Sequence, residues 1–368
     1  MNLSFSDSET AFAADARAWL RSHVVAPPAF ASLDDEIAWG RTWQAALAAD
    51  RWVGIHWPAE YGGRSATPVE VAIFNMEYAR AGAPQPVNRV GINLVGPTVL
   101  AHGTENQRSR WLPAILTAEE IWCQLYSEPA AGSDLGSLRT KAVKVDGGWQ
   151  LSGQKVWTSY AQFARWGLCL ARTEAGRITC FGVDMTGAGI DIRPLVQITG
   201  SAEFNEVFLD DVFVPDDCVI GGVDDGWRVA TTTLAHERGT TFPFKEQVVH
   251  EVYLDELFAA ANLDDLEVAD ALVGAFIELR VLRLHNWRTL SRLSRGEEPG
   301  PESSIVKLAW TDMTQHLSDA ALLVEGGESV LDGKWSRQWL WSKAASIAGG
   351  TSEIQKNIVG ERLLGLPR

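Results

Sequence analysis

The sequence predicts an α+β fold in which an N-terminal α-helical domain is followed by a middle β domain and a C-terminal bundle of helices. Three observations predict it. Helix-like apolar spacing fills residues 1–120, short alternating runs with turn residues fill residues 121–226, and long helix patterns return across residues 227–368. A chain of 368 residues is long for a single core, which agrees with several smaller domains.

The expected helices of the first domain depend on apolar residues at helix spacing. These residues recur in two stretches: Phe12, Trp19 and Leu20, and then Trp39, Trp43 and Leu47. A turn-rich break with two glycines follows at residues 58–63. We therefore expect an α-helical domain over residues 1–120.

The middle segment carries strand signals. Residues 140–145 and 149–151 are short alternating runs joined by Asp146-Gly147-Gly148, which is a strong hairpin signal. Further strands are expected at residues 166–172, 178–184 and 206–214. We therefore expect a small β domain over residues 121–226.

Long helix patterns return in the last third of the chain. They cover residues 227–237, 245–261, 265–296 and 301–323. Such a set of helices is typical of a helical bundle.

Composition and charge exclude several classes of protein. No stretch approaches the ~18 apolar residues of a membrane span, and the first 30 residues lack the pattern of an export signal, so we expect a soluble, cytoplasmic protein. The formal charge of −15, without a basic run, argues against a nucleic-acid partner. The four cysteines are far apart and form no CxxC pair, so we expect buried free thiols and no metal site.

The first informative segment is Ser-Glu-Pro-Ala-Ala-Gly-Ser-Asp at residues 127–134, followed later by Lys-Val-Trp-Thr-Ser at residues 155–159. Glycines let a backbone approach a flat ligand, hydroxyls can bond its edge, and Trp157 can cover its face. Taken alone, Trp157 or Ser133 is better explained as a strand-edge aromatic or a turn residue.

The second segment runs from Ser346 to Asn357 and contains Gly349-Gly350-Thr351-Ser352. A helix is expected to begin near Thr351 or Ser352, and Ser352 with Gln355 fits a capping box. Exposed N–H groups at such a helix start suit a phosphate or a polarised carbonyl, whereas a capped structural helix explains the same residues.

The third segment, residues 226–239, contains a carboxylate in line with apolar residues. Trp227, Ala230, Leu234 and Glu237 share one helical face. A desolvated Glu237 would have a raised pKa and could accept a proton from carbon, while a paired glutamate at a helix end is an equal alternative. His236 lies off this face and is interpreted as structural.

Together these segments resemble the acyl-CoA dehydrogenase family, in the same order and over nearly the whole chain. The matching motifs are Trp-Pro-Ala-Glu-Tyr-Gly-Gly at 57–63, Gly-Thr-Glu-Asn-Gln at 103–107, the segments 127–134 and 155–159, and residues 349–357 with Glu361-Arg362. The resemblance implies a helical domain, a β-barrel-like middle domain and a C-terminal four-helix bundle, with FAD between the last two.

The resemblance also implies roles for single residues. Five positions of the middle domain look like flavin contacts: Ser127, Gly132, Ser133, Trp157 and Ser159. Thr351 and Glu353 look like the C-terminal FAD contacts. Four positions look like substrate contacts: Ser133, Arg238, Gly349 and Gly350.

The catalytic base is expected at Glu237. Many relatives carry a glutamate directly before the Gly-Thr of the C-terminal segment, where this chain has Gly349. A second branch of the family places its base before an arginine on the helix that opens the C-terminal domain, and this chain has Glu237-Arg238 there. The resemblance therefore favours Glu237 as the base.

The implied reaction is α,β-dehydrogenation of an acyl-CoA to a trans-2-enoyl-CoA, with FAD as hydride acceptor and an electron-transfer flavoprotein as the next acceptor. Family members with the base on this helix suggest a branched, long or bulky acyl group. The family is mostly tetrameric or dimeric, so we expect a homo-oligomer.

One departure keeps alternatives open. Residues 240–300 lack the Arg-x-x-Phe-Gly stretch that many relatives use to hold FAD across a subunit interface. The chain is therefore either a divergent homo-oligomer, which we favour, or one subunit of a heteromeric dehydrogenase. A flavin monooxygenase or oxidase on the same fold is a further alternative.

Overall fold

The computed structural model describes residues 5–237, 242–297 and 300–367. The chain forms two compact units. The helical unit comprises Met1–Ala26, Ala66–Ala83 and Arg238–Arg368, and the sheet unit comprises Pro27–Ser65 and Pro84–Glu237. These units group segments by packing, so the expected domain bounds at residues 120 and 226 stay a prediction.

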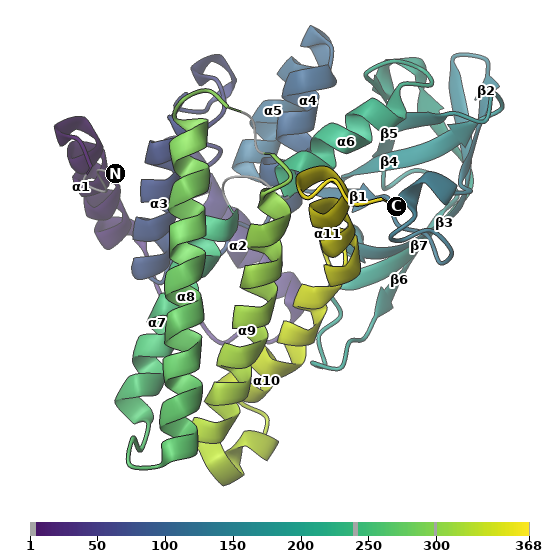
Figure 1. Cartoon of the computed structure of the whole chain (residues 1–368). Coiled ribbons are helices and arrows are strands. Elements are labelled where there is room, and N and C mark those ends of the chain that lie inside the picture. The colour runs from purple at the N-terminus through teal and green to yellow at the C-terminus, as the bar shows by residue number, and fades with distance from the viewer. Residues whose placement is uncertain (1–4, 238–241, 298–299, 368) are drawn as a thin grey trace. The chain divides into compact units, whose positions relative to one another are not determined.

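The helical unit combines helices from both ends of the chain. It contains α1 (Asp7–His23), α3 (Pro68–Arg80), α7 (Phe242–Ala260), α8 (Leu266–Leu293), α9 (Ser303–Glu325), α10 (Lys334–Ser342) and α11 (Ser352–Ile358). In Figure 1, α7, α8 and α9 run side by side, and α3 packs against α7. Leu272, Leu279 and Leu282 of α8 and Met313 and Leu317 of α9 fill the core of this bundle.

Local sequence signals start these helices. Ser6 and Glu9 form a capping box at α1, and Thr67 and Glu70 form another at α3. Asp265 caps α8 by accepting hydrogen bonds from the backbone N–H groups of the first turn. Each cap satisfies backbone donors that the first turn leaves without a partner, so the helix starts follow from short motifs.

The sheet unit surrounds its strands with short helices. Its helices are α2 (Leu33–Ala49), α4 (Gly96–His102), α5 (Glu105–Thr117) and α6 (Gly226–Glu237). Its strands are β1 (Trp122–Leu125), β2 (Lys141–Val145), β3 (Gly148–Ser159), β4 (Trp166–Thr173), β5 (Ile178–Asp184), β6 (Ile190–Leu195), β7 (Phe204–Pro215) and β8 (Val219–Ile220).

The described strands form one sheet in the order β6-β7-β3-β2-β4-β5-β8, and β1 pairs with β4. The predicted hairpin is confirmed, since β2 and β3 pair antiparallel with Val145 opposite Gly148 and Gly147 has a φ of 71°. The long β3 also pairs with β7, with register shifts after Leu151 and after Lys155. The second shift is at the candidate site.

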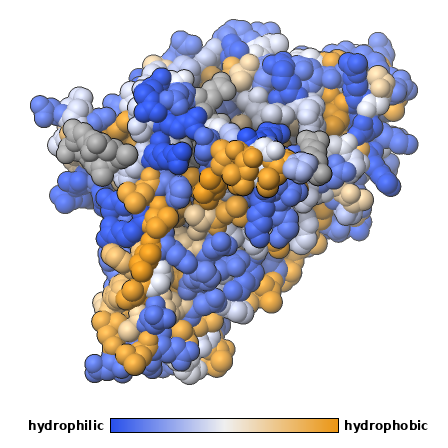
Figure 2. Space-filling view, in the orientation of Figure 1, coloured by the Kyte–Doolittle hydropathy of each residue, from blue (hydrophilic) through white to orange (hydrophobic). Residues whose placement is uncertain are grey.

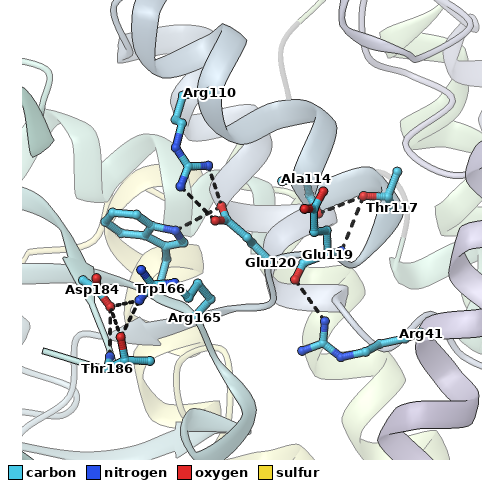
Figure 3. A network of polar contacts seen from close by, with 10 residues as sticks. All are labelled: Arg41, Arg110, Ala114, Thr117, Glu119, Glu120, Arg165, Trp166, Asp184 and Thr186. Atoms are coloured by element: carbon cyan, nitrogen blue, oxygen red, sulfur yellow. Dashed lines mark hydrogen bonds and ion pairs between the residues drawn. The ribbon is translucent and has the colours of Figure 1, made fainter.

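A polar network joins α2, α5 and the sheet (Figure 3). Arg110 donates to both carboxylate oxygens of Glu120, at 2.8 and 2.9 Å, and the indole N–H of Trp166 donates to the same carboxylate at 3.0 Å. Arg41 of α2 donates to the backbone carbonyl of Glu119 at 3.0 Å. These bonds fix the connection between α5 and β1, the strand that leads into the candidate site.

The predicted buried thiols are confirmed: Cys123, Cys169, Cys180 and Cys218 are all buried and form no disulfide. Burial raises the pKa of the Cys169 thiol to about 11. In the described part of the chain, none of the helices is both long enough and apolar enough to span a bilayer.

Candidate functional site

The loop after β1 carries three of the predicted flavin contacts. The backbone groups of Glu128 and Ala131 exchange two hydrogen bonds of 3.0 Å, which folds the loop into a tight turn. Ser133 and Gly132 are exposed beyond this turn, and a Cβ placed on Gly132 would meet no described atom within 4 Å. The described part of the chain therefore leaves the space next to Gly132 open.

Trp157 stands on an irregularity of β3. The register to β7 shifts between Lys155 and Thr158, and Trp157 has a φ of 59°, in the left-handed region that bulky residues rarely adopt. Its side chain is 61% exposed and touches Phe204 edge-on at 6.1 Å between ring centroids. A large aromatic side chain held in this way is typical of a ligand surface.

A buried ion pair holds this loop and strand together. Lys155 is 0% exposed and Glu128 is 7% exposed, and Nζ of Lys155 lies 2.8 Å from Oε1 of Glu128. The same ammonium donates to the carbonyls of Leu170 at 2.8 Å and Tyr126 at 3.3 Å. All three N–H groups of Lys155 therefore have acceptors.

The carboxylate of Glu128 is equally well satisfied. It accepts from the hydroxyl and the N–H of Thr140 at 2.6 and 2.9 Å, and from the N–H of Arg139 at 2.6 Å. Burial by itself favours the neutral acid, but the charge and the hydrogen bond of Lys155 outweigh it, so the pKa of Glu128 is lowered. The turn at residues 127–131 is thereby tied to the strand that carries Trp157.

These residues fit the ring system of a flavin. The backbone N–H of Val156 donates to the carbonyl of Ser127 at 2.9 Å, which brings the loop next to the start of the Trp157 irregularity. Ser127 and Ser159 are half-buried hydroxyl donors, and Trp157 offers an exposed indole face. Hydroxyl donors beside a flat aromatic surface match a planar heterocycle with polar edges.

Helix α6 is held in the sheet unit by buried hydroxyl groups. The phenol of Tyr126 donates to Oγ1 of Thr233 at 2.9 Å, and Oγ1 of Thr98 lies 2.9 Å from the same atom. His102 hydrogen-bonds Thr232 at 2.7 Å, which adds a second tie between α4 and α6. Since Tyr126 directly precedes Ser127, helix α6 and the loop with the predicted flavin contacts share one anchor.

The predicted apolar face of α6 is only partly correct. Ala230 is buried, but Trp227 is 50% exposed and Leu234 is half-buried. The buried face consists instead of Val229, Ala230 and Thr233, because β5 and α4 cover that side of the helix. Glu237 closes α6 one turn after Thr233; its side chain, and Arg238 altogether, lie outside the described residues.

His56, also in the sheet unit, is expected to make the stability of the protein depend on pH. Burial, with a smaller contribution from His236, lowers the pKa of His56 from 6.5 to about 4. The unfolded chain therefore binds a proton at His56 where the folded chain does not, and stability is lost as pH falls from 6.5 towards 4.

We expect the free energy of unfolding of wild type to fall between pH 7 and pH 5, with about 1–2 kcal/mol of the loss due to His56. Urea denaturation at both pH values measures this loss. The His56→Gln variant should lack the part of the loss that is due to His56. The control His23→Gln changes an exposed histidine on α1 and should lose as much unfolding free energy between pH 7 and pH 5 as wild type. If His56→Gln also loses as much as wild type, His56 is not the cause of this pH dependence.

The C-terminal residues of the predicted site form one turn of the helical unit. Gly349 and Gly350 have φ values of 68° and 90°. Nε2 of the fully buried Gln355 donates to their carbonyls at 3.0 and 3.3 Å, while its buried Oε1 has no hydrogen-bond partner among the described residues. A Cβ on Gly350 would approach Nε2 of Gln355 to 2.7 Å, so glycine is needed there.

The predicted capping box at this helix is wrong. The N-cap is Thr351, whose hydroxyl accepts from the N–H of Ile354 at 3.3 Å. Gln355 bonds the glycine carbonyls instead of closing a box with Ser352, because the two left-handed glycines turn those carbonyls towards it. Glu353 is exposed, and hydrogen bonds from its own N–H and from Thr351 lower the pKa of its carboxyl.

The structure thus places the predicted residues in two sets, one on each unit. The loop and β3 bring together Ser127, Gly132, Ser133, Trp157 and Ser159, and the start of α11 with the turn before it holds Gly349, Gly350, Thr351 and Glu353. Sequence reasoning assigned no role to Lys155, Glu128, Tyr126 or Thr233, and it gave Gln355 a different role, in a capping box. The sequence signal for these supporting residues was Lys155, a charged residue within an otherwise half-buried strand.

Comparison with known proteins finds similar sequences and structures along nearly the whole chain. Three domain models match: the acyl-CoA dehydrogenase N-terminal domain at residues 6–119, the middle domain at 123–212 and the C-terminal domain at 224–364. Among solved structures, the Tcur3481-Tcur3483 steroid ACAD aligns with a TM-score of 0.87, 26% identity and 100% of both chains. The ChsE4-ChsE5 complex from Mycobacterium tuberculosis aligns with a TM-score of 0.86, 28% identity and 100% of both chains.

Two curated relatives from Mycobacterium tuberculosis are close in sequence. The acyl-CoA dehydrogenase IpdE1 is 43% identical over 89% of this chain and 88% of its own length. The acyl-CoA dehydrogenase FadE34 is 45% identical over 88% of this chain, which spans about half (46%) of FadE34. With its three domain matches and these relatives, the chain belongs to the acyl-CoA dehydrogenase family of flavoprotein oxidoreductases.

Proposed function

We propose that this chain catalyses the α,β-dehydrogenation of an acyl-CoA thioester to a trans-2-enoyl-CoA, with Glu237 as the base. The observation that carries the proposal is the shared anchor of α6 and the flavin-contact loop at the Tyr126–Thr233 hydrogen bond. Glu237 follows Thr233 by one helical turn, and Ser127 follows Tyr126 directly. This hydrogen bond therefore joins the helix that carries the proposed base to the loop that carries the proposed flavin contacts.

The residues divide the chemistry between them. Glu237 removes the α proton, which the thioester carbonyl acidifies. Backbone N–H groups at Gly349 and Gly350 stabilise the negative charge that develops on the carbonyl oxygen. Trp157, Ser127 and Ser159 hold and orient the flavin ring, and Thr351 and Glu353 hold other parts of the cofactor. FAD, when bound, accepts the hydride from the β carbon.

We further propose a bulky acyl group, of the steroid-derived class, and an electron-transfer flavoprotein as the electron acceptor. The structurally similar Tcur3481-Tcur3483 protein is a steroid ACAD, which supports this substrate class. The base on α6 agrees with family branches that act on branched, long or bulky chains. Arg238 and Ser133 are assigned to substrate binding.

A heteromeric dehydrogenase is the second candidate. The missing Arg-x-x-Phe-Gly stretch favours it. Two similar structures also support it, because each is named for two different proteins: Tcur3481-Tcur3483 and ChsE4-ChsE5. A homo-oligomer remains our first candidate, because this chain carries both its own base and its own C-terminal FAD segment.

The proposal is tested by anaerobic titration of the purified holoenzyme with acyl-CoAs, following the bleaching of the flavin absorption band. The panel contains straight-chain, branched-chain and steroid-side-chain CoA thioesters. Bleaching strongest with the steroid thioester supports both reaction and substrate class. A yellow protein that no thioester bleaches but that releases peroxide in air would favour an oxidase or monooxygenase, and a colourless protein would favour a missing partner subunit.

Loss of the Tyr126 hydroxyl is expected to displace the base without removing it. Tyr126→Phe deletes the donor to Thr233, which costs about 1 kcal/mol of stability, and we expect a roughly tenfold lower kcat from a misplaced general base. KM should change little, while the primary isotope effect with α-deuterated substrate should rise as proton removal becomes slower.

Thr233→Ser keeps the hydroxyl and is the matched control, expected to stay near wild type. A Tyr126→Phe variant that loses stability but keeps the wild-type kcat and isotope effect would show that the hydrogen bond has a structural role alone.

A further inference from the structure

The end of β3 contains two residues in an unusual backbone conformation. Trp157 has a φ of 59° and Tyr160 a φ of 53°, both in the left-handed region that is disfavoured for side chains of this size. Thr158 and Ser159 lie between them. Such backbone strain persists only where the surrounding structure holds it, and it gathers at ligand sites. Residues 157–160 are named the strained segment below.

Trp157 is exposed for a different reason from the apolar side chains of α8. Those side chains, among them Ile277 and Val281, project from a regular helix and form the orange band along α8 in Figure 2. Trp157 instead stands where the register between β3 and β7 shifts, so its exposure follows from the local path of the backbone. Whatever fixes that path also fixes the direction of the indole.

Asn205 of β7 holds this part of the backbone. It is 0% exposed and pairs with Thr158, the position at which the regular register resumes. Its Nδ2 donates to the carbonyl of Thr158 at 3.0 Å and to Oε1 of Gln162 at 2.5 Å, and it lies 3.4 Å from the carbonyl of Glu203. An asparagine amide has two N–H groups, so both are used.

The orientation of this amide follows from its neighbours. Two of the three acceptors are backbone carbonyls, which cannot donate, so the NH2 group must face them. The other amide atom, Oδ1 of Asn205, is buried and accepts from no group in the described part of the chain. Asn205 therefore acts as a donor alone, and a carboxylate of the same shape would set an acceptor against three acceptors.

The residues just before Asn205 bond the strained segment and the turn after it. The backbone N–H of Tyr160 donates to the carbonyl of Glu203 at 2.7 Å, and Nε2 of Gln162 donates to the carbonyl of Ala202 at 3.1 Å. Asn205 connects these two bonds, because it donates to Oε1 of Gln162 and approaches the same carbonyl of Glu203. Its amide therefore stands at the centre of the contacts that hold the end of β3.

We propose that Asn205 is a positioning residue for the flavin, which holds the strained segment so that Trp157 and Ser159 face the cofactor. The inference rests on the proposed function, in which these two residues contact the flavin ring. Asn205 is fully buried, so it acts through the backbone of the strained segment and not by contact. Loss of its donors lets the segment relax towards a regular strand, which turns both side chains away from their present directions.

Asn205→Asp in the holoenzyme tests the proposal, because it removes both donors without changing the size of the side chain. We expect the dissociation constant of the flavin, measured by ultrafiltration, to rise more than tenfold. The visible circular dichroism of the flavin that stays bound should change. The backbone amide of Tyr160 should exchange with deuterium faster than in wild type, because the segment that carries it is loosened.

The matched control is Gln107→Glu, which changes another buried amide of the sheet unit. Gln107 donates to the carbonyls of Asp217 and Val219 at 2.7 and 2.8 Å, and β8, which begins at Val219, lies at the far end of the strand order from β6 and β7. This variant should lose stability but keep the flavin affinity and circular dichroism of wild type. Equal changes in both variants would show a general loss of folding and overturn the positioning role.

Gln162→Met is a milder second variant, which keeps the proposal testable if Asn205→Asp does not fold. Gln162 is half-buried, and Asn205 keeps its carbonyl acceptors in this variant. The same three measurements should therefore change in the same direction by a smaller amount.

Trp157→Leu separates this inference from the proposed function. If Trp157→Leu leaves the flavin affinity and circular dichroism unchanged, Trp157 is not a flavin contact, and this inference fails together with that assignment. If Trp157→Leu changes both while Asn205→Asp and Gln162→Met change neither, the flavin contact stands and Asn205 has a structural role alone.

Discussion

Glutamine in place of Glu237 is expected to lower kcat by roughly 100-fold to 10,000-fold, the range found when a general base is removed. Glutamine keeps the size and shape of the side chain but cannot accept the proton. Flavin content and affinity for the substrate should change little, because the proposed flavin contacts lie on the loop after β1, on β3 and at the start of α11. Anaerobic stopped-flow measurement of flavin bleaching separates the chemical step from product release.

The matched control is Glu174→Gln, an exposed glutamate in the turn between β4 and β5, which should retain wild-type rates. Glu237→Asp keeps a carboxylate and should recover part of the rate. If Glu237→Gln bleaches as fast as wild type, Glu237 is not the base and the role must pass to another group, since Gly349 carries no side chain.

Methionine in place of Lys155 is expected to destabilise the protein by about 3–5 kcal/mol, because it leaves the buried Glu128 carboxylate without its counter-ion. The turn at residues 127–131 and the irregularity of β3 both depend on this pair, so the purified variant should also lose flavin. Urea denaturation measures the first effect, and the ratio of flavin absorbance to protein absorbance measures the second.

Two further variants identify the cause of this effect. Lys144→Met removes an ion pair with Asp216 whose side chains are about half exposed, and should cost less than about 1 kcal/mol. Glu128→Gln/Lys155→Met removes both charges and should be more stable than Lys155→Met alone. If the double variant is no more stable than the single one, the loss arises from packing around Lys155 and not from the unpaired carboxylate.

The order of elements could be predicted because local signals specify it. Asp146-Gly147-Gly148 predicts the β2–β3 hairpin that the structure contains, and the predicted strand at residues 178–184 matches β5 in both bounds. The predicted helix at residues 227–237 corresponds to α6 with a difference of one residue. Turn residues and apolar spacing act within a few positions, so they can be recognised without tertiary contacts.

Strands whose burial comes from distant partners were missed. β1 pairs in parallel with β4, about 40 residues further along, and has no turn residues of its own to mark it. β6 is a short, largely exposed edge strand whose alternating run is interrupted by Pro194. The same limit explains why Trp227 was placed on the buried face of α6, since the side that β5 and α4 cover is set by tertiary packing.

Short motifs predict the candidate site residues. The residues that support them are recognised only from contacts between positions that are distant in sequence. Lys155 meets Glu128 across 27 positions, and Tyr126 meets Thr233 across 107 positions. A buried charge cannot be told from an exposed one in a short motif, so the ion pair beneath the loop became visible only in the folded chain. Similarly, the hydrogen bonds that Gln355 donates to Gly349 and Gly350 depend on the left-handed conformation of these two glycines.

The exposed indole of Trp157 also has an optical consequence. Indole fluorescence shifts to longer wavelength in water, and dissolved iodide quenches rings that it can reach. Tryptophans of the core, such as Trp166 and Trp43, are buried and inaccessible to iodide. Trp227 and Trp341 are exposed like Trp157, so the signal of Trp157 is the difference between wild type and Trp157→Phe. A planar chromophore stacked on Trp157 would shield it and accept its excitation energy, so the chain carries an intrinsic spectroscopic reporter of ring stacking that needs no turnover.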